Sequence, residues 1–271
     1  MAIFEIRDNG ENEKRLLGYL FYYERSKRFF AELLSELDEW DAPFIFEGFV
    51  KQGRYSIDSE WAMRFVRQRI IPSDRQNLGQ ILKEYKLSVY DEYKLLQLSE
   101  GRCAQDELYL VRCSYADIVP EIRERFEKKV HDLIPMDHNH VMVFFNDQTA
   151  WSIDIGVMRG EDRRYLKVLK DQRIFRNARV SPGGHGIEWG EERFIPAEIL
   201  YQSGTSSEMR YGDLLAFIAD RLADTTEAAG LLNCSRQYIN QLFSQEKLLP
   251  VKRGSNNNLF LKSDIERDDF R

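Results

Sequence analysis

Apolar positions follow a helical rhythm in the first half of the chain. Between residues 13 and 40, leucines and aromatic residues recur every three or four positions, which predicts a long amphipathic helix. Residues 59–71 form a second predicted helix. Asp58 or Ser59 can cap its start, and Pro72 disfavours helical backbone in the residue before it.

Further segments of the N-terminal part show the same spacing. Helices are predicted there over residues 75–85 and 90–98, and the apolar run at residues 107–113 predicts one strand. Most of residues 12–130 is therefore expected to be helical. The sequence predicts an α-rich domain over residues 1–130.

The pattern changes near residue 131. Short segments rich in β-branched and aromatic residues are separated by Gly, Pro, Asn and Asp, which is typical of strands and turns. The predicted strands cover residues 140–147, 149–155, 175–181 and 186–194. Residues 161–175, between two of these strands, have the spacing of a short helix. Residues 196–204, after the last strand, predict a helical turn. Residues 131–204 are thus predicted to be a small α+β domain with an antiparallel sheet.

A third predicted domain spans residues 211–271, after small polar residues at 203–209 that resemble a linker. It begins with a predicted helix over residues 211–224. The apolar residues of that helix fall on one face, and they are Leu214, Leu215, Ile218 and Leu222.

Two short helices joined by a tight turn follow. Thr225 can cap the first helix, and Glu227 lies favourably in its first turn. Its buried side is predicted to consist of small or apolar residues, which permit close approach of a crossing helix; they are Ala228, Ala229 and Leu232.

The second helix is predicted to start after an Asn233-Cys234 turn, with Ser235 as its cap. Three apolar residues should point inward: Ile239, Leu242 and Phe243. The outward residues carry donors and acceptors of the kind that read base edges and phosphates. They are Arg236, Gln237, Tyr238, Asn240 and Gln241.

Residues 247–266 then predict a strand, a turn, a second strand and a helix, which completes a winged helix-turn-helix order. The C-terminal 50 or so residues resemble the excisionase-type and MerR-like DNA-binding domains of bacteria and their mobile elements. The residues that carry the resemblance are Thr225, Glu227, Ala228, Ala229, Leu232, Ser235, Arg236, Ile239, Lys247, Leu248, Pro250, Lys262, Ser263, Asp264 and Ile265. The resemblance implies DNA binding, although the tip at residues 255–258 is neutral where those families usually have basic residues.

Charge distribution agrees with this interpretation. The chain has a net charge of −6, which argues against indiscriminate coating of nucleic acid. Between residues 235 and 262, however, five basic residues face one acidic residue, Glu246. The predicted DNA-contacting residues are Thr225, Ser235, Arg236, Gln237, Tyr238, Asn240, Gln241, Lys252 and Arg253.

The middle segment resembles small bacterial domains of uncharacterised function, which occur alone or fused to helix-turn-helix units in settings like toxin–antitoxin pairs. Residues 141–155 and 174–204 carry this resemblance, including the Gly-Ile-Glu-Trp strand. It implies a small α+β module that could bind a partner, without assigned chemistry.

Other candidate sites are weaker. His138 and His140 could chelate a metal, but no second ligand pair lies near them in sequence. The cluster Arg54, Arg64, Arg67, Arg69 and Arg75 could bind nucleic acid beside Trp61 and Phe65, although a solvated helix face paired with acidic residues explains it better. Residues 103–107 lack a partner histidine for a cysteine nucleophile.

The sequence thus predicts an α+β multidomain protein with a C-terminal winged helix-turn-helix. Three scattered cysteines indicate no disulfide framework, no apolar run reaches membrane-spanning length, and the N-terminus lacks a signal-peptide core, so the cytoplasm is expected. The predicted function is sequence-specific DNA binding, as a transcriptional regulator or antitoxin-like autoregulator, by a homodimer on double-stranded DNA. The alternative is a protein-interaction or inhibitor module, anti-defence or toxin-neutralising, that binds a toxin or defence protein through residues 1–205. In this alternative the C-terminal DNA-binding unit only represses the protein's own gene. Neither enzymatic activity nor a cofactor or metal is predicted.

Overall fold

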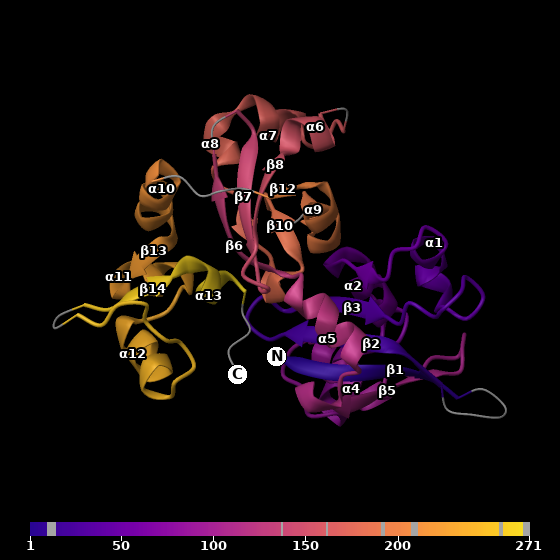
Figure 1. The fold of residues 1–271 in the computed structure, drawn as a ribbon. Coiled ribbons are helices and arrows are strands. Elements are labelled where there is room, and N and C mark those ends of the chain that lie inside the picture. Colours follow the sequence, from indigo (N-terminus) through magenta and orange to yellow (C-terminus); the bar gives the residue numbers. More distant parts are fainter. Residues whose placement is uncertain are drawn as a thin grey trace. The chain divides into compact units, whose positions relative to one another are not determined.

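The computed structural model describes residues 1–9, 15–136, 138–160, 162–190, 193–206, 211–254 and 257–267. The chain divides into two compact units, Met1–Arg123 and Glu124–Arg271, whose elements are labelled in Figure 1. None of the helices within these described ranges has the length and apolarity that a bilayer crossing requires. The division into domains at 1–130, 131–204 and 211–271 stays a prediction.

The first unit is built on an antiparallel sheet of five strands in the order β4-β3-β2-β1-β5. The strands are β1 (Ala2–Asp8), β2 (Arg15–Tyr23), β3 (Arg28–Leu33), β4 (Ser56–Ile57) and β5 (Leu108–Cys113). The helical elements are η1 (Phe44–Phe46), α1 (Glu47–Val50), α2 (Ser59–Arg67), α3 (Leu78–Glu84), α4 (Glu92–Ser99), η2 (Tyr115–Asp117) and α5 (Pro120–Glu127), the last of which spans the boundary between the units.

The predicted helix over residues 13–40 is wrong, and so is the α-rich N-terminal domain. Residues 15–33 instead form the hairpin of β2 and β3, whose turn contains Lys27 in the left-handed conformation (φ 53°). Residues 17–23 and 29–33 are all buried, so both faces of these two strands are covered. A continuous apolar run contains positions three and four apart as well as two apart, and spacing alone cannot separate a doubly covered strand from a helix.

Predictions that relied on local signals in this unit are confirmed. Asp58 caps α2, with its Oδ1 accepting from the Trp61 backbone N–H at 3.0 Å. The structure also contains the predicted helices within residues 75–85 and 90–98, as α3 and α4, and the predicted strand β5. The helix predicted to run to residue 71 ends earlier, at Arg67.

Two small antiparallel sheets form the first part of the second unit. One has the order β12-β8-β7-β6 and the other β11-β10-β9. The strands are β6 (Val130–Pro135), β7 (His140–Phe145), β8 (Ala150–Asp154), β9 (Arg179–Val180), β10 (Gly186–Glu188), β11 (Phe194–Pro196) and β12 (Thr205–Ser206). The helices are α6 (Ile155–Arg159), α7 (Leu166–Lys170), α8 (Gln172–Phe175), the short η3 (Pro182–Gly184) and α9 (Ala197–Ser203).

The helix predicted over residues 161–175 is divided into α7 and α8. Asp171 has extended backbone (φ −117°, ψ 102°) and caps α8, with its Oδ1 accepting from the Arg173 N–H at 2.9 Å. A capping aspartate stabilises a new helix start and therefore interrupts the apolar period. The sequence did not indicate β6, which is separated from α5 by Lys128 and Lys129.

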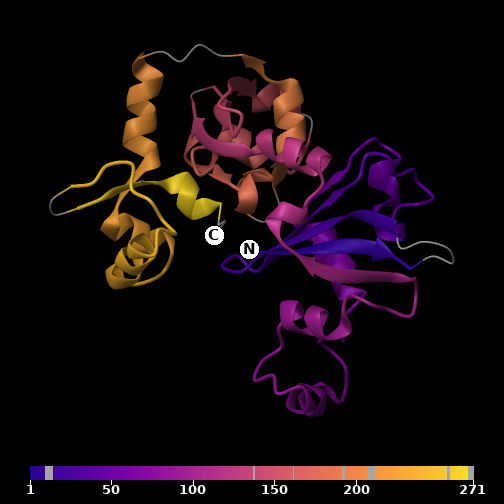
Figure 2. The same cartoon turned by 60° about the horizontal axis from the view of Figure 1, so that its bottom comes forward.

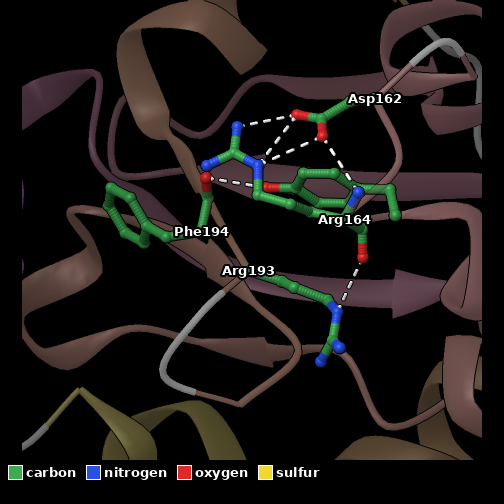
Figure 3. Close-up of polar contacts among 5 residues, drawn as sticks. Asp162, Arg164, Arg193 and Phe194 are labelled. Carbon is green, nitrogen blue, oxygen red and sulfur yellow. Dashed lines mark hydrogen bonds and ion pairs between the residues drawn. The ribbon is translucent and has the colours of Figure 1, made fainter.

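A group of polar contacts holds the segment before α7 to β11 (Figure 3). The hydroxyl of Tyr165 donates to the Phe194 carbonyl at 2.9 Å, and Arg193 Nε donates to the Arg164 carbonyl at 2.8 Å. Arg164 also forms an ion pair with Asp162 at 2.7 Å, and its hydrogen bonds lower the pKa of that carboxyl. Most of the Arg164 side chain is exposed, so we expect this ion pair to add little stability.

The C-terminal part of the second unit contains α10 (Tyr211–Arg221), β13 (Leu222–Asp224), α11 (Thr225–Leu231), α12 (Arg236–Ser244), β14 (Leu259–Leu261) and α13 (Lys262–Glu266). Helix α10 is a straight helix in both views (Figures 1 and 2). The predicted linker at 203–209 lies partly outside the described residues.

The wing differs from its prediction. Strand β14 pairs with β13, which precedes the two short helices. Among the described residues of the arm after α12, the pairing with β14 is a single bridge between Lys252 and Leu259. Pro250 comes two residues before Lys252 in the chain. It has no N–H to donate, so hydrogen bonding between strands is limited at this position. The start of the predicted wing tip, residues 255–256, lies outside the described residues.

A buried ion triad connects the four-stranded sheet to the C-terminal helices. Arg221, at the end of α10, donates from Nε to Asp132 Oδ1 of β6 and from Nη2 to Glu266 Oε2 of α13, both at 2.7 Å. The three side chains are at most 10% exposed. Burial alone would lower the pKa of Arg221, but the charges of Glu266 and Asp132 raise it, so the guanidinium stays charged.

Candidate nucleic-acid interface

The first of the two short helices begins with a capping box. Asp224, at the end of β13, accepts from the backbone N–H groups of Thr226 (2.6 Å) and Glu227 (2.9 Å), and the Glu227 carboxylate accepts from the Asp224 N–H at 2.9 Å. Hydrogen bonds from the Glu227 and then the Thr226 backbone lower the pKa of Asp224. The predicted cap, Thr225, is wrong by one position. Thr225 is the first helical residue and only 5% exposed, so its side chain does not belong to the exposed surface.

A wing residue braces this helix start. Asn257 donates from Nδ2 to Asp224 Oδ2 at 3.1 Å, and its Oδ1 accepts from the Thr225 N–H at 3.3 Å. The sequence suggested only that the wing tip is uncharged. Here one of its asparagines satisfies the helix terminus. The signal available in the sequence was the Asp-x-x-Glu spacing from Asp224 to Glu227, which is a capping-box pattern.

The turn between the helices is a Schellman motif. The N–H of Cys234 donates to the Ala229 carbonyl at 2.9 Å and the N–H of Asn233 to the Gly230 carbonyl at 3.1 Å. Asn233 has φ +47°, in the left-handed region that asparagine tolerates better than most other residues. The predicted Asn233-Cys234 turn is confirmed, and it fixes the angle at which the next helix leaves.

Asn233→Val is expected to lower the free energy of unfolding by about 1–2 kcal/mol, because a β-branched side chain is strained at positive φ. Asn233→Gly should be neutral or slightly stabilising, because glycine accepts this backbone without strain. Urea denaturation of both variants checks the prediction. Equal stabilities for the valine and glycine variants would contradict the proposed role of the turn.

Helix α12 is anchored by one apolar edge. Ile239 and Leu242 are buried and pack with Ala228 and Ala229 of α11, as predicted. Ser235 caps α12, with its Oγ accepting from the Tyr238 N–H at 3.2 Å. The two alanines carry little bulk, so the helices approach closely and α12 has a defined orientation.

The other faces of α12 are exposed. All five predicted reading residues are exposed, and they are Arg236, Gln237, Tyr238, Asn240 and Gln241. Arg236 and Asn240 are four residues apart, as are Gln237 and Gln241, so two adjacent rows of polar side chains follow the helix surface. Nine residues give a helix about 13 Å long, which suits the width of a DNA major groove.

The predicted phosphate contacts lie after α12. Lys252 and Arg253 are exposed, and the backbone of Lys252 is held by the bridge to Leu259. The Arg253 guanidinium lies over the Phe243 ring, 5.3 Å from its centroid, which places that charge beside the end of α12. Phe243, predicted to point inward, is partly buried.

Comparison of the chain with models of protein families, with curated proteins and with solved structures found no match. The resemblance to excisionase-type and MerR-like domains stays a prediction.

Members of the candidate arginine cluster of the first unit have acidic and aromatic partners. Arg69 is buried against the Phe65 ring and forms an ion pair with Asp106. Arg64 pairs with Glu60 at 2.6 Å. Two members of the cluster are thus engaged with acidic residues, in line with the interpretation as a paired helix surface.

The other residues singled out in the sequence form small polar groups. His140 Nε2 lies 3.8 Å from Asp154 Oδ2, and its Nδ1 contacts the His138 carbonyl at 3.0 Å. Cys103 contacts Asp106, at 3.4 Å. Within the part of the chain that the structure describes, no group of three or more His, Cys, Asp or Glu side chains could hold a metal ion.

Proposed function

We propose that this protein is a sequence-specific DNA-binding protein, a transcriptional regulator or antitoxin-like autoregulator that places α12 in the major groove. The observation that carries the proposal is the exposed double row of Arg236, Asn240, Gln237 and Gln241 on a helix held rigidly by α11. Arginine pairs best with guanine, and asparagine or glutamine with adenine. We therefore expect a half-site that contains both purines.

Local charge supports the same proposal. Five basic residues and one acidic residue lie between positions 235 and 262 of a chain whose net charge is −6. Phosphate attraction is then concentrated near α12 while the rest of the chain disfavours non-specific contact. A single helix-turn-helix contacts few base pairs, so we also propose that two copies bind a palindromic site.

Replacing Lys252 and Arg253 by alanine is expected to weaken binding to all duplexes alike, because both side chains are assigned to phosphates. The slope of log K against log salt should fall by about 2, since each phosphate contact contributes about 0.9. Fluorescence anisotropy over a salt series measures this slope. Lys170→Ala/Arg173→Ala removes the same two charges from exposed positions near α7 and α8 and should leave it unchanged. An unchanged slope for Lys252→Ala/Arg253→Ala would contradict the assignment.

A second candidate function is protein binding through residues 1–205. In the first unit, Trp40 is 84% exposed and Phe44 is 89% exposed, and large exposed aromatic side chains often mark interaction surfaces. The two functions respond to different changes. A partner protein retained by Arg236→Ala/Gln237→Ala but lost by Trp40→Ala/Phe44→Ala would support this function, whereas retention by both variants would count against it.

A further inference from the structure

A cavity of about 520 Å³ in the second unit is lined by residues of β6, β7, α10 and β14. This volume lies within the range of small-molecule sites, about 300–1,000 Å³. Leu214 of α10 lines the cavity and is 41% exposed, so the cavity is not sealed from solvent. None of the predicted DNA-contacting residues lines it.

The apolar walls suit a flat ring. Phe144 of β7 and Phe217 of α10 meet edge to face, with ring centroids 5.6 Å apart. Leu214 of α10 and Leu261 of β14 add aliphatic surface to the cavity wall. Aromatic side chains in this arrangement favour stacking or edge contact with a third ring.

The imidazole of His131 supplies a hydrogen-bond donor. Its Nδ1 lies 2.8 Å from Arg267 Nη1 and 3.3 Å from Asn146 Oδ1. A guanidinium can only donate, and Asn146 Oδ1 itself accepts from Arg267 Nη1 at 3.1 Å, so the shorter contact assigns Nδ1 as the acceptor. The tautomer in which Nδ1 accepts carries its proton on Nε2, for which the described residues provide no hydrogen-bond partner. A ligand with a carbonyl oxygen or a ring nitrogen can accept from it.

Two further groups supply acceptors. Gln148, in the turn after β7, lines the cavity, and the described residues offer its side-chain amide no hydrogen-bond partner. Asp132 is 1% exposed; its Oδ1 accepts from Arg221 and from the Leu133 N–H, whereas its buried Oδ2 has no partner within the described ranges. An unsatisfied buried carboxylate oxygen is uncommon and points to a missing donor.

The cavity walls belong to elements that lead to the helix-turn-helix. Helix α10 runs directly into β13, which ends at the cap of α11, and Leu261 belongs to β14, which pairs with β13. A molecule in the cavity would therefore contact both the four-stranded sheet and the segment that positions α11.

We infer that this cavity binds a small neutral heteroaromatic compound that carries both a hydrogen-bond acceptor and a donor. The ring lies against Phe144 and Phe217, the acceptor faces His131, and the donor faces Gln148 or Asp132. This inference goes beyond DNA binding and does not depend on it.

The test uses the full chain without DNA and three neutral probes that carry these groups: nicotinamide, adenine and 2-pyridone. Saturation-transfer NMR detects binding, and calorimetric titration measures its affinity. Leu214→Trp places a larger side chain in the cavity wall. Leu215→Trp is the matched control, because Leu215 is a neighbouring exposed leucine of α10 that does not line the cavity. Gln148→Ala removes one polar contact from an exposed turn residue.

At least one probe should bind the unmodified protein and Leu215→Trp with the same affinity. Binding should be at least about tenfold weaker in Leu214→Trp, in which the ring site is filled, and several-fold weaker in Gln148→Ala. The inference is overturned if none of the three probes binds, or if both Leu214→Trp and Gln148→Ala bind as the unmodified protein does. Because no DNA is present, these results are independent of whether the protein binds DNA.

Discussion

Arg221→Met is expected to lower the free energy of unfolding by about 3–5 kcal/mol, the usual loss when one partner of a buried ion pair is removed. Without the guanidinium, the carboxylates of Asp132 and Glu266 remain buried without their countercharge. Methionine fills much of the same volume, so the loss should report the missing charge more than a cavity. Urea denaturation at about pH 7 measures it.

The loss should depend on pH in a defined direction. Burial raises the pKa of Asp132, and Arg221 opposes that rise. Removal of Arg221 therefore raises this pKa further, and the folded variant takes up a proton more readily than the unfolded chain. A carboxyl whose pKa is higher in the folded than in the unfolded state favours the folded state as the pH falls. The difference in the free energy of unfolding between the unmodified protein and Arg221→Met should therefore shrink as the pH falls from about 7 towards about 5.

Arg164→Met is the matched control for this prediction. Arg164 forms an ion pair of the same length, 2.7 Å, but its side chain is 72% exposed. Exposed pairs contribute about 0–1 kcal/mol, and the control should lose no more than that. A loss in Arg221→Met as small as in the control, or one that grows on acidification, would show that the triad does not hold the C-terminal helices to the sheet.

Arg236→Ala/Gln237→Ala is expected to weaken binding to the preferred duplex by about 100-fold or more, because each base contact contributes about 1–3 kcal/mol. Both side chains are exposed at the start of α12 and neither belongs to the buried core of these helices, so the fold should be unaffected. Fluorescence anisotropy at constant salt measures the affinities, and circular dichroism checks the fold.

The control removes the same residue types elsewhere. Gln172 and Arg173 are adjacent and exposed on α8, so Gln172→Ala/Arg173→Ala deletes one glutamine and one arginine away from α12. It should bind the preferred duplex as the unmodified protein does. Equal weakening in both double variants would indicate a general charge effect, and α12 would lose its assignment as the reading helix.

Local signals predicted the C-terminal helices well. A helix cap, a close helix contact and a tight turn each depend on residues that are near one another in sequence. Ser235 caps α12, Ala228 and Ala229 are buried on α11, and Asn233 forms the turn, all as predicted. The error at Thr225 arose because Asp224, one position earlier, is the stronger acceptor and lies where β13 ends.

Long-range pairing could not be predicted in the same way. The apolar run that forms β2 fits a helical period, and only its pairing with β1 and β3 decides for a strand. Likewise β14 pairs with β13 across more than 30 residues of chain, and the Asp132 and Arg221 partners are 89 positions apart. Nothing in the local sequence indicates such partners.

Selection of bound duplexes from a random-sequence library, at near-physiological salt, tests the central proposal most directly. We expect one enriched motif that contains guanine and adenine, arranged as two half-sites about one helical turn apart, and lost when Arg236→Ala/Gln237→Ala replaces the unmodified protein. Absence of enrichment, or weak binding that disappears with added salt and is the same in the double variant, would contradict sequence-specific DNA binding by α12.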